Sequence, residues 1–365
     1  MEDSEVVRHL LEYIINSDER LEVALSVSTA EEALARLPGL RPDIISMDIN
    51  LPGMDGLEAT HRIMTEQPTP ILIVSSSIAD QEANTSLEAL RAGALTVAEK
   101  PVGIGHPHFD VQATQLINKL VIMSEVPVVR QRQGRYLRTG GPSPQGGITP
   151  TDFVAITRKA EIYLALGVVA STGGPQALVR LFTDLGNDFP LPVFLVQHIT
   201  PAFVDSFARW LESVTRWKVI IAEEGTRPVP GHIYIAPADC HLRVEPGGAT
   251  GNVRLTLSGS PLVSGQRPSG SELFSSMAAT YGRQAIGVLL TGMGEDGADG
   301  LLAMRTAGAH TIAEDQSTAI VYGMPAAAVN RGAATETLPL HRIGGSILAL
   351  LRPQPMTSEN RKMTP

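Results

Sequence analysis

The sequence predicts two α/β domains, each built on a mostly parallel, doubly wound sheet covered by helices. Short apolar, β-branched runs alternate with segments of helical period on both sides of a stretch rich in Pro, Gly, Gln and Arg. The chain has 365 residues, enough for two domains of roughly 100 to 200 residues each. We expect a first domain over residues 1–123, a linker over 124–160, a second domain over 161–352 and a disordered tail over 353–365.

The first domain has the pattern of four strands and five helices. The strands are expected at 21–27, 43–48, 71–75 and 95–98, and the helices near 4–15, 30–37, 56–66, 80–92 and 110–123. A βα domain with five helices begins with a strand, whereas this sequence starts in what resembles the first strand-to-helix loop. We therefore expect the sheet to lack its first, central strand, and interpret the start of the chain as assigned too late.

The second domain resumes the alternation after the linker. Strands are expected at 162–170, 193–197, 219–222, 233–235, 285–290 and 310–313, with helices between most of them. Gly247 and Gly248 separate two strand-like runs within residues 241–257, which predicts a hairpin there.

Composition excludes several classes of protein. Cys240 is the only cysteine, so neither an intrachain disulfide nor a four-cysteine zinc site can form. Apolar runs fall short of the roughly 18 to 20 residues of a membrane span, and the acidic N-terminus is unlike a signal peptide. We expect a soluble, cytoplasmic protein without membrane insertion.

Charge is unevenly distributed along the chain. Residues 1–123 have 8 basic and 19 acidic side chains, residues 124–160 have 6 and 2, and residues 161–365 have 15 and 17. An acidic first domain and a near-neutral second domain offer no basic face to a phosphate backbone, so nucleic-acid binding is disfavoured. Four arginines within residues 127–150 form either a solvated tether or a docking segment for the acidic domain: Arg130, Arg132, Arg135 and Arg138.

Acidic side chains lie at predicted strand ends in the first domain. Glu2 and Asp3 precede the first helix, and Asp48 closes the apolar strand 43–48. Ligands of open parallel sheets bind beyond the carboxyl ends of the strands, and clustered carboxylates suit Mg²⁺. Lys100 could pair with Asp48 or with a phosphoryl group on it, although each acid taken singly is more often a solvated loop residue or a helix cap.

The segment Asp48-Ile49-Asn50-Leu51-Pro52-Gly53-Met54-Asp55-Gly56, with Ser75 and Lys100-Pro101 further on, resembles the receiver domain of two-component response regulators. The resemblance covers about residues 1–123 and implies a flavodoxin-like fold. It implies that Asp48 is the phosphoacceptor, that Glu2, Asp3, Asp48 and the Asn50 carbonyl hold Mg²⁺, that Ser75 is the switch hydroxyl, and that Lys100 contacts the phosphate.

A serine follows the first strand of the second domain. Ser171-Thr172-Gly173-Gly174-Pro175 joins an apolar strand to a helix, a turn that exposes the serine near a helix N-terminus and suits a nucleophile. A phosphate-binding turn and a simple capped helix start are the alternatives. Neither GxGxxG nor GxxxxGK[ST] occurs, which weakens the nucleotide interpretation.

A base and a carboxylate follow two other strands. His198 comes after the strand 193–197, and Asp296 comes after the strand 285–290 and a glycine-rich turn. Because parallel strands end at one rim, we expect both residues to lie near Ser171 as general base and orienting acid. A calcium loop at Asp296 and Asp299 is disfavoured, since the D-x-D-x-D-G spacing is missing.

The second domain is similar to the chemotaxis protein-glutamate methylesterases, and with a receiver in front the similarity extends over about residues 4–352. It rests on Ser171 to Gly174, Gln197-His198, Pro230 to Pro237, Arg267-Pro268-Ser269 and Thr291 to Gly294. It implies a triad of Ser171, His198 and Asp296, an oxyanion N–H from Met293, and Thr172 lining the site. Val169 stands where the family usually has the first glycine of G-x-S-x-G. Because Ser-Thr-Gly-Gly itself is intact, we expect the turn to adjust to this β-branched side chain. Cys240 and His241 are interpreted as loop residues rather than metal ligands.

The resemblance implies hydrolysis of glutamate methyl esters on methyl-accepting chemoreceptors, with deamidation of receptor glutamines by the same acyl chemistry. A histidine kinase would phosphorylate Asp48, move the receiver from the serine rim and raise activity. No cofactor is expected in the second domain. Two alternatives remain open: a constitutive esterase with an inert, shortened receiver, and a non-enzymatic signalling adaptor based on the receiver.

Overall fold

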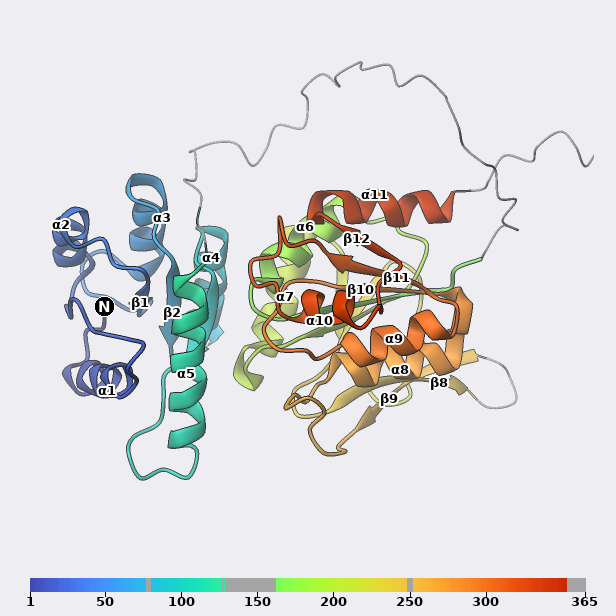
Figure 1. Ribbon diagram of the computed structural model, residues 1–365, viewed down its shortest axis with the longest axis horizontal. Coiled ribbons are helices and arrows are strands. Elements are labelled where there is room, and N and C mark those ends of the chain that lie inside the picture. Colours follow the sequence, from blue (N-terminus) through green and yellow to red (C-terminus); the bar gives the residue numbers. More distant parts are fainter. Residues whose placement is uncertain (77–79, 127, 129–161, 248–251, 353–365) are drawn as a thin grey trace, which may run out of the picture.

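The computed structural model describes residues 1–76, 80–126, 128, 162–247 and 252–352, which form two α/β domains side by side (Figure 1). Most of the expected linker, with these four arginines, and the expected tail lie outside these residues. Within the described part of the chain, no helix has both the length and the apolar character needed to cross a bilayer.

The first domain has a three-stranded parallel sheet in the order β1-β2-β3. Its strands are β1 (Ile45–Met47), β2 (Ile71–Ser75) and β3 (Thr96–Glu99). Its helices are α1 (Glu5–Asn16), α2 (Ala30–Leu40), α3 (Gly56–Glu66), α4 (Asp80–Arg91) and α5 (Phe109–Ser124).

Alternate side chains of the buried strand β2 pack on opposite faces of this sheet. Leu72 and Val74 belong to the core shared with α1 and α5, whereas Ile71 and Ile73 belong to the core shared with α3 and α4. This alternation follows from the two-residue period of a strand, and it explains why β2 is an uninterrupted apolar run.

The prediction of a strand at residues 21–27 is wrong, because the segment has no strand beside it with which to pair. The Met1 ammonium donates to Ser46 O at 2.8 Å, and the Glu2 N–H donates to Val27 O at 3.1 Å. Residues 1 and 2 thus fill only the end of the space between β1 and the segment 21–27. The rest of that space is a cavity of about 480 Å³ lined by both segments and by side chains of α1, α2 and α5.

The second domain has a seven-stranded parallel sheet in the order β12-β11-β10-β4-β5-β7-β6. The strands are β4 (Ala165–Ala170), β5 (Val193–Gln197), β6 (Lys218–Ile221), β7 (His232–Ile235), β10 (Ala285–Leu289), β11 (His310–Glu314) and β12 (Glu336–Leu338). All six strands predicted for this sheet are present with small shifts at their ends. The short, partly exposed β12 was not predicted, because three residues carry too little periodicity.

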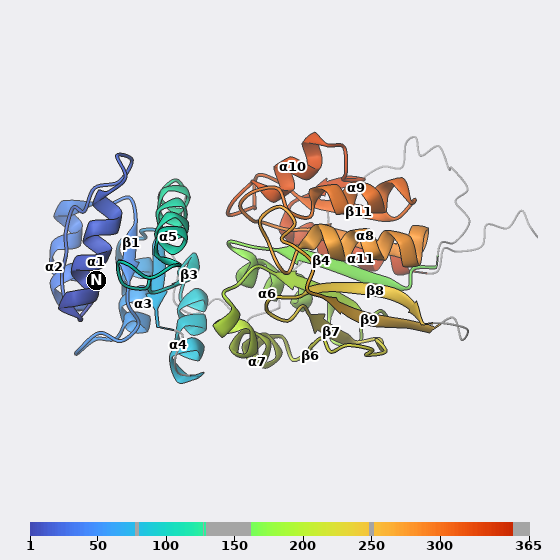
Figure 2. The same ribbon diagram turned by 90° about the horizontal axis from the view of Figure 1, so that it is seen from below.

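Helices cover both faces of this sheet (Figure 2). On one face lie α6 (Gly174–Leu185), α7 (Val204–Thr215) and α11 (Leu340–Leu351), and on the other lie α8 (Gly270–Tyr281), α9 (Ala298–Thr306) and α10 (Met324–Asn330). The predicted hairpin is present as β8 (His241–Gly247) and β9 (Asn252–Ser258), packed against α8. The chain order reverses at β4, whose neighbours are β5 and β10, so the crevice beyond these three strand ends is the expected ligand site.

Candidate active site

Ser171 lies at the turn between β4 and α6, next to the reversal point of the sheet. Gly173 adopts φ +80°, and a Cβ on it would lie 2.7 Å from Ile320 Cβ, so this turn requires glycine. The Ser171 N–H donates to Thr291 O, and the Gly174 N–H donates to Ser171 O. The serine backbone is therefore fixed from both sides while its side chain remains partly exposed.

His198 follows β5 just as Ser171 follows β4, and the pairing of the strands brings the two residues side by side. Ala170 pairs with Gln197, and the His198 N–H donates to Ala170 O at 3.0 Å. In the described part of the chain Ser171 makes no direct hydrogen bond to His198, whose Nδ1 is buried without a partner. The hydrogen bond between a nucleophile and its base is often long before substrate binds. The structure therefore establishes that Ser171 and His198 are neighbours.

Asp296 lies on the other side of the His198 ring. His198 Nε2 is 2.9 Å from Asp296 Oδ2, and the two side chains are 8% and 2% exposed. A carboxylate accepts the proton from Nε2, so the free electron pair of the neutral imidazole is on Nδ1. The ring nitrogen available to Ser171 is therefore Nδ1, whereas the usual arrangement in serine hydrolases is Nε2 toward the serine.

The Asp296 carboxylate is surrounded by donors from the start of α8. Its Oδ1 accepts from Ser269 Oγ at 2.6 Å and from the Ser271 N–H at 3.2 Å, and its Oδ2 accepts from the Gly270 N–H at 2.6 Å. Burial by itself raises the pKa of Asp296, but the hydrogen bonds and the charge of His198 outweigh burial and lower that pKa. His198 and, to a lesser extent, the donors at the start of α8 thus favour the ionised form of this buried carboxylate.

The residues after β10 form the third wall of the crevice. The Thr291 hydroxyl donates to Thr172 O at 2.9 Å, and a Cβ on Gly292 would lie 2.7 Å from Ser171 Cβ. Thr172 is buried, and Met293 is 37% exposed at the rim. All five predicted residues of the second domain therefore gather around one crevice: Ser171, Thr172, His198, Met293 and Asp296.

Two buried groups at this site were not predicted. Glu314, the last residue of β11, is fully buried, and it accepts a 2.8 Å hydrogen bond from the Thr291 N–H. Burial raises the pKa of Glu314 to about 7. Ser269 is the N-cap of α8, and the signal that could have identified it is the capping-box spacing from Ser269 to Glu272.

The interpretation of His241 as a loop residue is wrong. It is the first residue of β8, fully buried, with both ring nitrogens hydrogen-bonded. Cys240 lies in the preceding turn with a free, partly exposed thiol.

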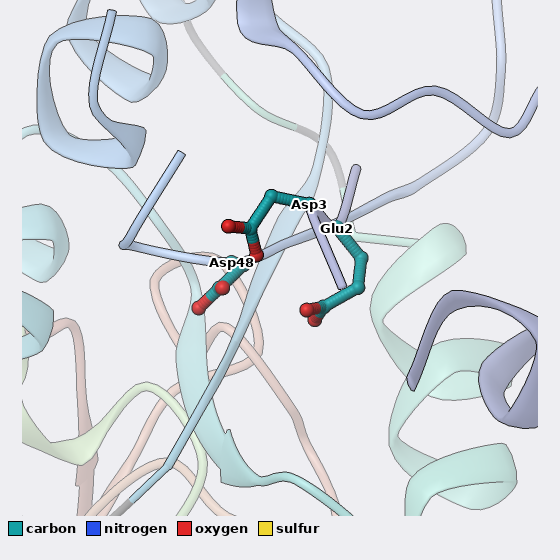
Figure 3. A group of neighbouring side chains, drawn as sticks. All are labelled: Glu2, Asp3 and Asp48. Carbon is teal, nitrogen blue, oxygen red and sulfur yellow. The ribbon is translucent and has the colours of Figure 1, made fainter. Parts of the chain in front are cut away.

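The first domain gathers its predicted acidic residues at the end of β1. Carboxylate oxygens of Glu2, Asp3 and Asp48 lie within 4.8 Å of one another (Figure 3). Lys100 Nζ is 2.8 Å from Asp48 Oδ2 and 3.0 Å from the Glu2 carboxylate. Burial raises the pKa of Glu2, whereas the hydrogen bonds to Asp48 and Glu2 outweigh burial and raise the pKa of Lys100.

This donor set fits a hard divalent cation. Asp48 Oδ1 is buried without a hydrogen-bond partner, and three carboxylates with one lysine leave excess negative charge for a cation to neutralise. Asn50 is exposed two residues after Asp48, where its carbonyl could contribute a further ligand. Ser75 is buried at the end of β2, and its hydroxyl bonds Ser76 O rather than Asp48.

The two domains meet next to the serine turn. Gln176, in the first turn of α6, donates through Nε2 to Leu90 O at 2.8 Å and to Ala94 O at 3.0 Å. Leu90 lies in the last turn of α4, and Ala94 follows the end of this helix. Ile320 and Val321 pack against a first-domain cluster of Leu95, Met123 and Val126.

The same two residues, Ile320 and Val321, also contact the candidate active site. Ile320 contacts Gly173, and Val321 exchanges hydrogen bonds with Thr291 and Gly292. The first domain therefore touches a loop that supports the crevice directly.

Both domains match known protein families. Residues 166–347 match the model of the CheB methylesterase family, and residues 1–107 match that of the response regulator receiver domain. The chain is 48% identical to protein-glutamate methylesterase/protein-glutamine glutaminase 2 of Paramagnetospirillum magneticum, over 95% of each chain. It is 42% identical to a protein of the same description from Nitrosospira multiformis, over 96% of each. The crystal structure of the Thermotoga maritima CheB methylesterase catalytic domain is similar with a TM-score of 0.50 and 35% identity, covering 52% of this chain and 98% of that one.

Proposed function

Because the chain belongs to the protein-glutamate methylesterase/protein-glutamine glutaminase family, we propose that its second domain hydrolyses glutamate methyl esters and deamidates glutamines on chemoreceptors, under control of its receiver domain. The observation that carries the catalytic part is the bond between His198 Nε2 and Asp296 Oδ2, formed beside Ser171 at the reversal point of the sheet. This bond leaves Nδ1 as the one ring nitrogen without a partner, and we assign to it the role of base for Ser171.

In the first half-reaction, Ser171 Oγ attacks the ester carbonyl while its proton passes to His198 Nδ1. The C–O bond to the methoxy group then breaks, and His198 returns the proton so that methanol leaves. Asp296 keeps its charge throughout and stabilises the imidazolium. For a glutamine substrate the same steps release ammonia.

In the second half-reaction, water attacks the acyl-enzyme with His198 again as base. This step regenerates Ser171 and yields free glutamate on the receptor. General base catalysis of this kind contributes typically about 10² to 10⁴ to the rate.

The tetrahedral intermediate carries an oxyanion that needs donors opposite the base. We assign this role to the Met293 N–H and to the N–H of Thr172, the residue after the nucleophile, by analogy with other serine turns. Thr291 holds the backbone of the serine turn, because its hydroxyl donates to Thr172 O and its carbonyl accepts from the Ser171 N–H. Loss of one such donor typically costs about 10² to 10³ in kcat.

Regulation acts through Asp48 as phosphoacceptor of a histidine kinase. Glu2, Asp3, Asp48 and the Asn50 carbonyl would hold Mg²⁺, which would neutralise charge on the incoming phosphoryl group. Lys100 pairs with Asp48 and Glu2, so phosphorylation changes the charge balance that fixes this lysine. Through Gln176 and the Ile320–Val321 contact, the receiver restrains the crevice until that change releases it.

The test is methanol release from methylated chemoreceptor membranes, measured with and without Mg²⁺ and a small phosphodonor. The wild-type rate should rise with phosphodonor, Ser171→Ala should abolish release, and Asp48→Asn should leave only the unstimulated rate. Release that needs Ser171 but ignores phosphodonor would identify a constitutive esterase. No release from a folded chain would favour the adaptor.

A further inference from the structure

Ser269 bonds Asp296 from the side opposite His198, and its hydroxyl has a fixed direction. Ser269 Oγ accepts from the Ser271 N–H at 3.1 Å and from the Glu272 N–H at 3.4 Å. A hydroxyl has two lone pairs and one proton, so with both lone pairs used the proton goes to Asp296 Oδ1 at 2.6 Å. This donor cannot rotate away without breaking the cap of α8.

His241 fixes the backbone of Ser269 in turn. The Ser269 N–H donates to His241 Nδ1 at 3.1 Å, which places the ring proton on Nε2, and Nε2 donates to Pro261 O at 3.1 Å. Both side chains are fully buried. The hydrogen bonds thus run without interruption from Pro261 through His241, Ser269 and Asp296 to His198.

We propose that Ser269, held by His241, is a positioning residue for the esterase reaction: it keeps Asp296 in the orientation that aligns the His198 ring with Ser171. The inference rests on the proposed function. Asp296 has two other partners here, the Gly270 and Ser271 N–H groups, and both belong to the turn that Ser269 caps. Removal of the hydroxyl therefore removes one donor and loosens the other two.

A positioning role for Ser269 differs from helix capping alone because it also affects His198 through Asp296. With fewer donors on Asp296, more of its negative charge acts on the imidazolium, which becomes harder to deprotonate. Without the Ser269 hydroxyl, Asp296 can turn and the His198 ring loses its alignment with Ser171. Ser269→Ala should for this reason lower kcat by about 10- to 100-fold, the worth of a hydrogen bond to a charged group, with little change in KM. It should also move the acidic limb of the pH profile of kcat/KM to higher pH.

The matched control is Ser276→Ala on the same helix. Ser276 is buried and also makes two hydrogen bonds, accepting from the Val244 N–H and donating to Leu273 O, but it does not touch Asp296. It should lower stability with the pH profile unchanged. Ser269→Thr retains the hydroxyl and should restore most of the rate.

A second pair of variants tests His241 without altering Ser269. His241→Asn retains an acceptor near the position of Nδ1, whereas His241→Gln presents its polar group further out. We expect the Asn variant to stay within about threefold of wild type and the Gln variant to fall about tenfold with the same shift of the pH profile. The double variant with Ser269→Ala and His241→Gln should lose little more activity than Ser269→Ala alone, because both changes act through the orientation of Asp296.

The experiment is the kcat/KM pH profile for methanol release by the full chain, with melting temperatures for each variant and Ser171→Ala as reference. Loss of all release in Ser171→Ala, together with identical profiles for Ser269→Ala and Ser276→Ala, would overturn the positioning role and leave the esterase intact. Release that survives Ser171→Ala would overturn the proposed function itself.

Discussion

Val169 packs against Gly270, and this contact accommodates a β-branched residue at the position where the family usually has glycine. A Cβ on Gly270 would lie 2.8 Å from Val169 Cγ2 and closer still to Cγ1. Val169 is fully buried and directed at the start of α8 rather than at Ser171. The branched side chain therefore occupies the space that glycine leaves at position 270, and the same Gly270 donates its N–H to Asp296.

Gly270→Ala should disrupt both packing and catalysis. The added methyl group must displace Val169 or the α8 turn, at a cost of about 1 to 3 kcal/mol in the free energy of unfolding, and it moves a donor to Asp296. Adding Val169→Gly should recover much of the rate, although not all of the stability. Urea unfolding and methanol release would measure both effects, and equal losses in the single and double variants would contradict the packing argument.

Gln176→Ala should raise the activity of the unphosphorylated chain. The change removes two hydrogen bonds to α4, each worth about 0.5 to 1.5 kcal/mol, so we expect a several-fold higher rate without phosphodonor and a smaller response to it. Thr183→Ala is the control, because Thr183 lies exposed on the same helix and bonds only within it. An unstimulated rate equal to wild type would exclude Gln176 as a restraint.

Glu314→Gln should change how stability depends on pH. Burial raises the folded-state pKa of Glu314 from its ordinary value of 4.5 to about 7, so protonated Glu314 is favoured in the fold. Its contribution is fully present below about pH 4.5 and is lost as pH rises through about 7. The Gln variant stays neutral, so its melting temperature should fall less than that of wild type between pH 5 and pH 8. Parallel curves for the two proteins would refute the assignment.

An extended apolar segment placed ahead of Met1 should stabilise the receiver domain. Burial lowers the pKa of the Met1 ammonium from 8.0 to about 6. The folded domain therefore favours the neutral amine, and its free energy of unfolding is highest above about pH 8 and decreases as the pH falls through about 6. Five residues such as Ile-Val-Leu-Val-Ile would remove this buried charge, pair with β1 and with residues 23–27, and fill the cavity.

A Gly-Ser extension of equal length is the control for this prediction. It removes the same charge but fills little of the cavity. Calorimetry should show a higher melting temperature for the apolar extension, and amide exchange should slow at residues 23–27. Identical behaviour of the two extensions would show that the cavity does not accept a strand.

The sequence alone determined the two-domain α/β organisation and predicted most of the residues that gather at the two candidate sites. Strand patterns are local, and residues that follow parallel strands converge on one edge wherever the sheet forms. Ser171, His198 and Asp48 could therefore be identified from a strand followed by a chemically distinctive residue. The same reasoning failed at residues 21–27, whose composition favours a strand, because a strand also requires a neighbour.

Only the tertiary structure decided how these residues are held. Ser269 and His241 lie 27 and 55 positions before Asp296, on a cap and a hairpin strand, and no periodicity connects them. The tautomer of His198, the fit of Val169 against Gly270 and the contact of Gln176 with α4 depend on packing between distant segments. Local sequence encodes which elements form, whereas the direction of a buried hydrogen bond is fixed by the donors and acceptors that packing leaves available.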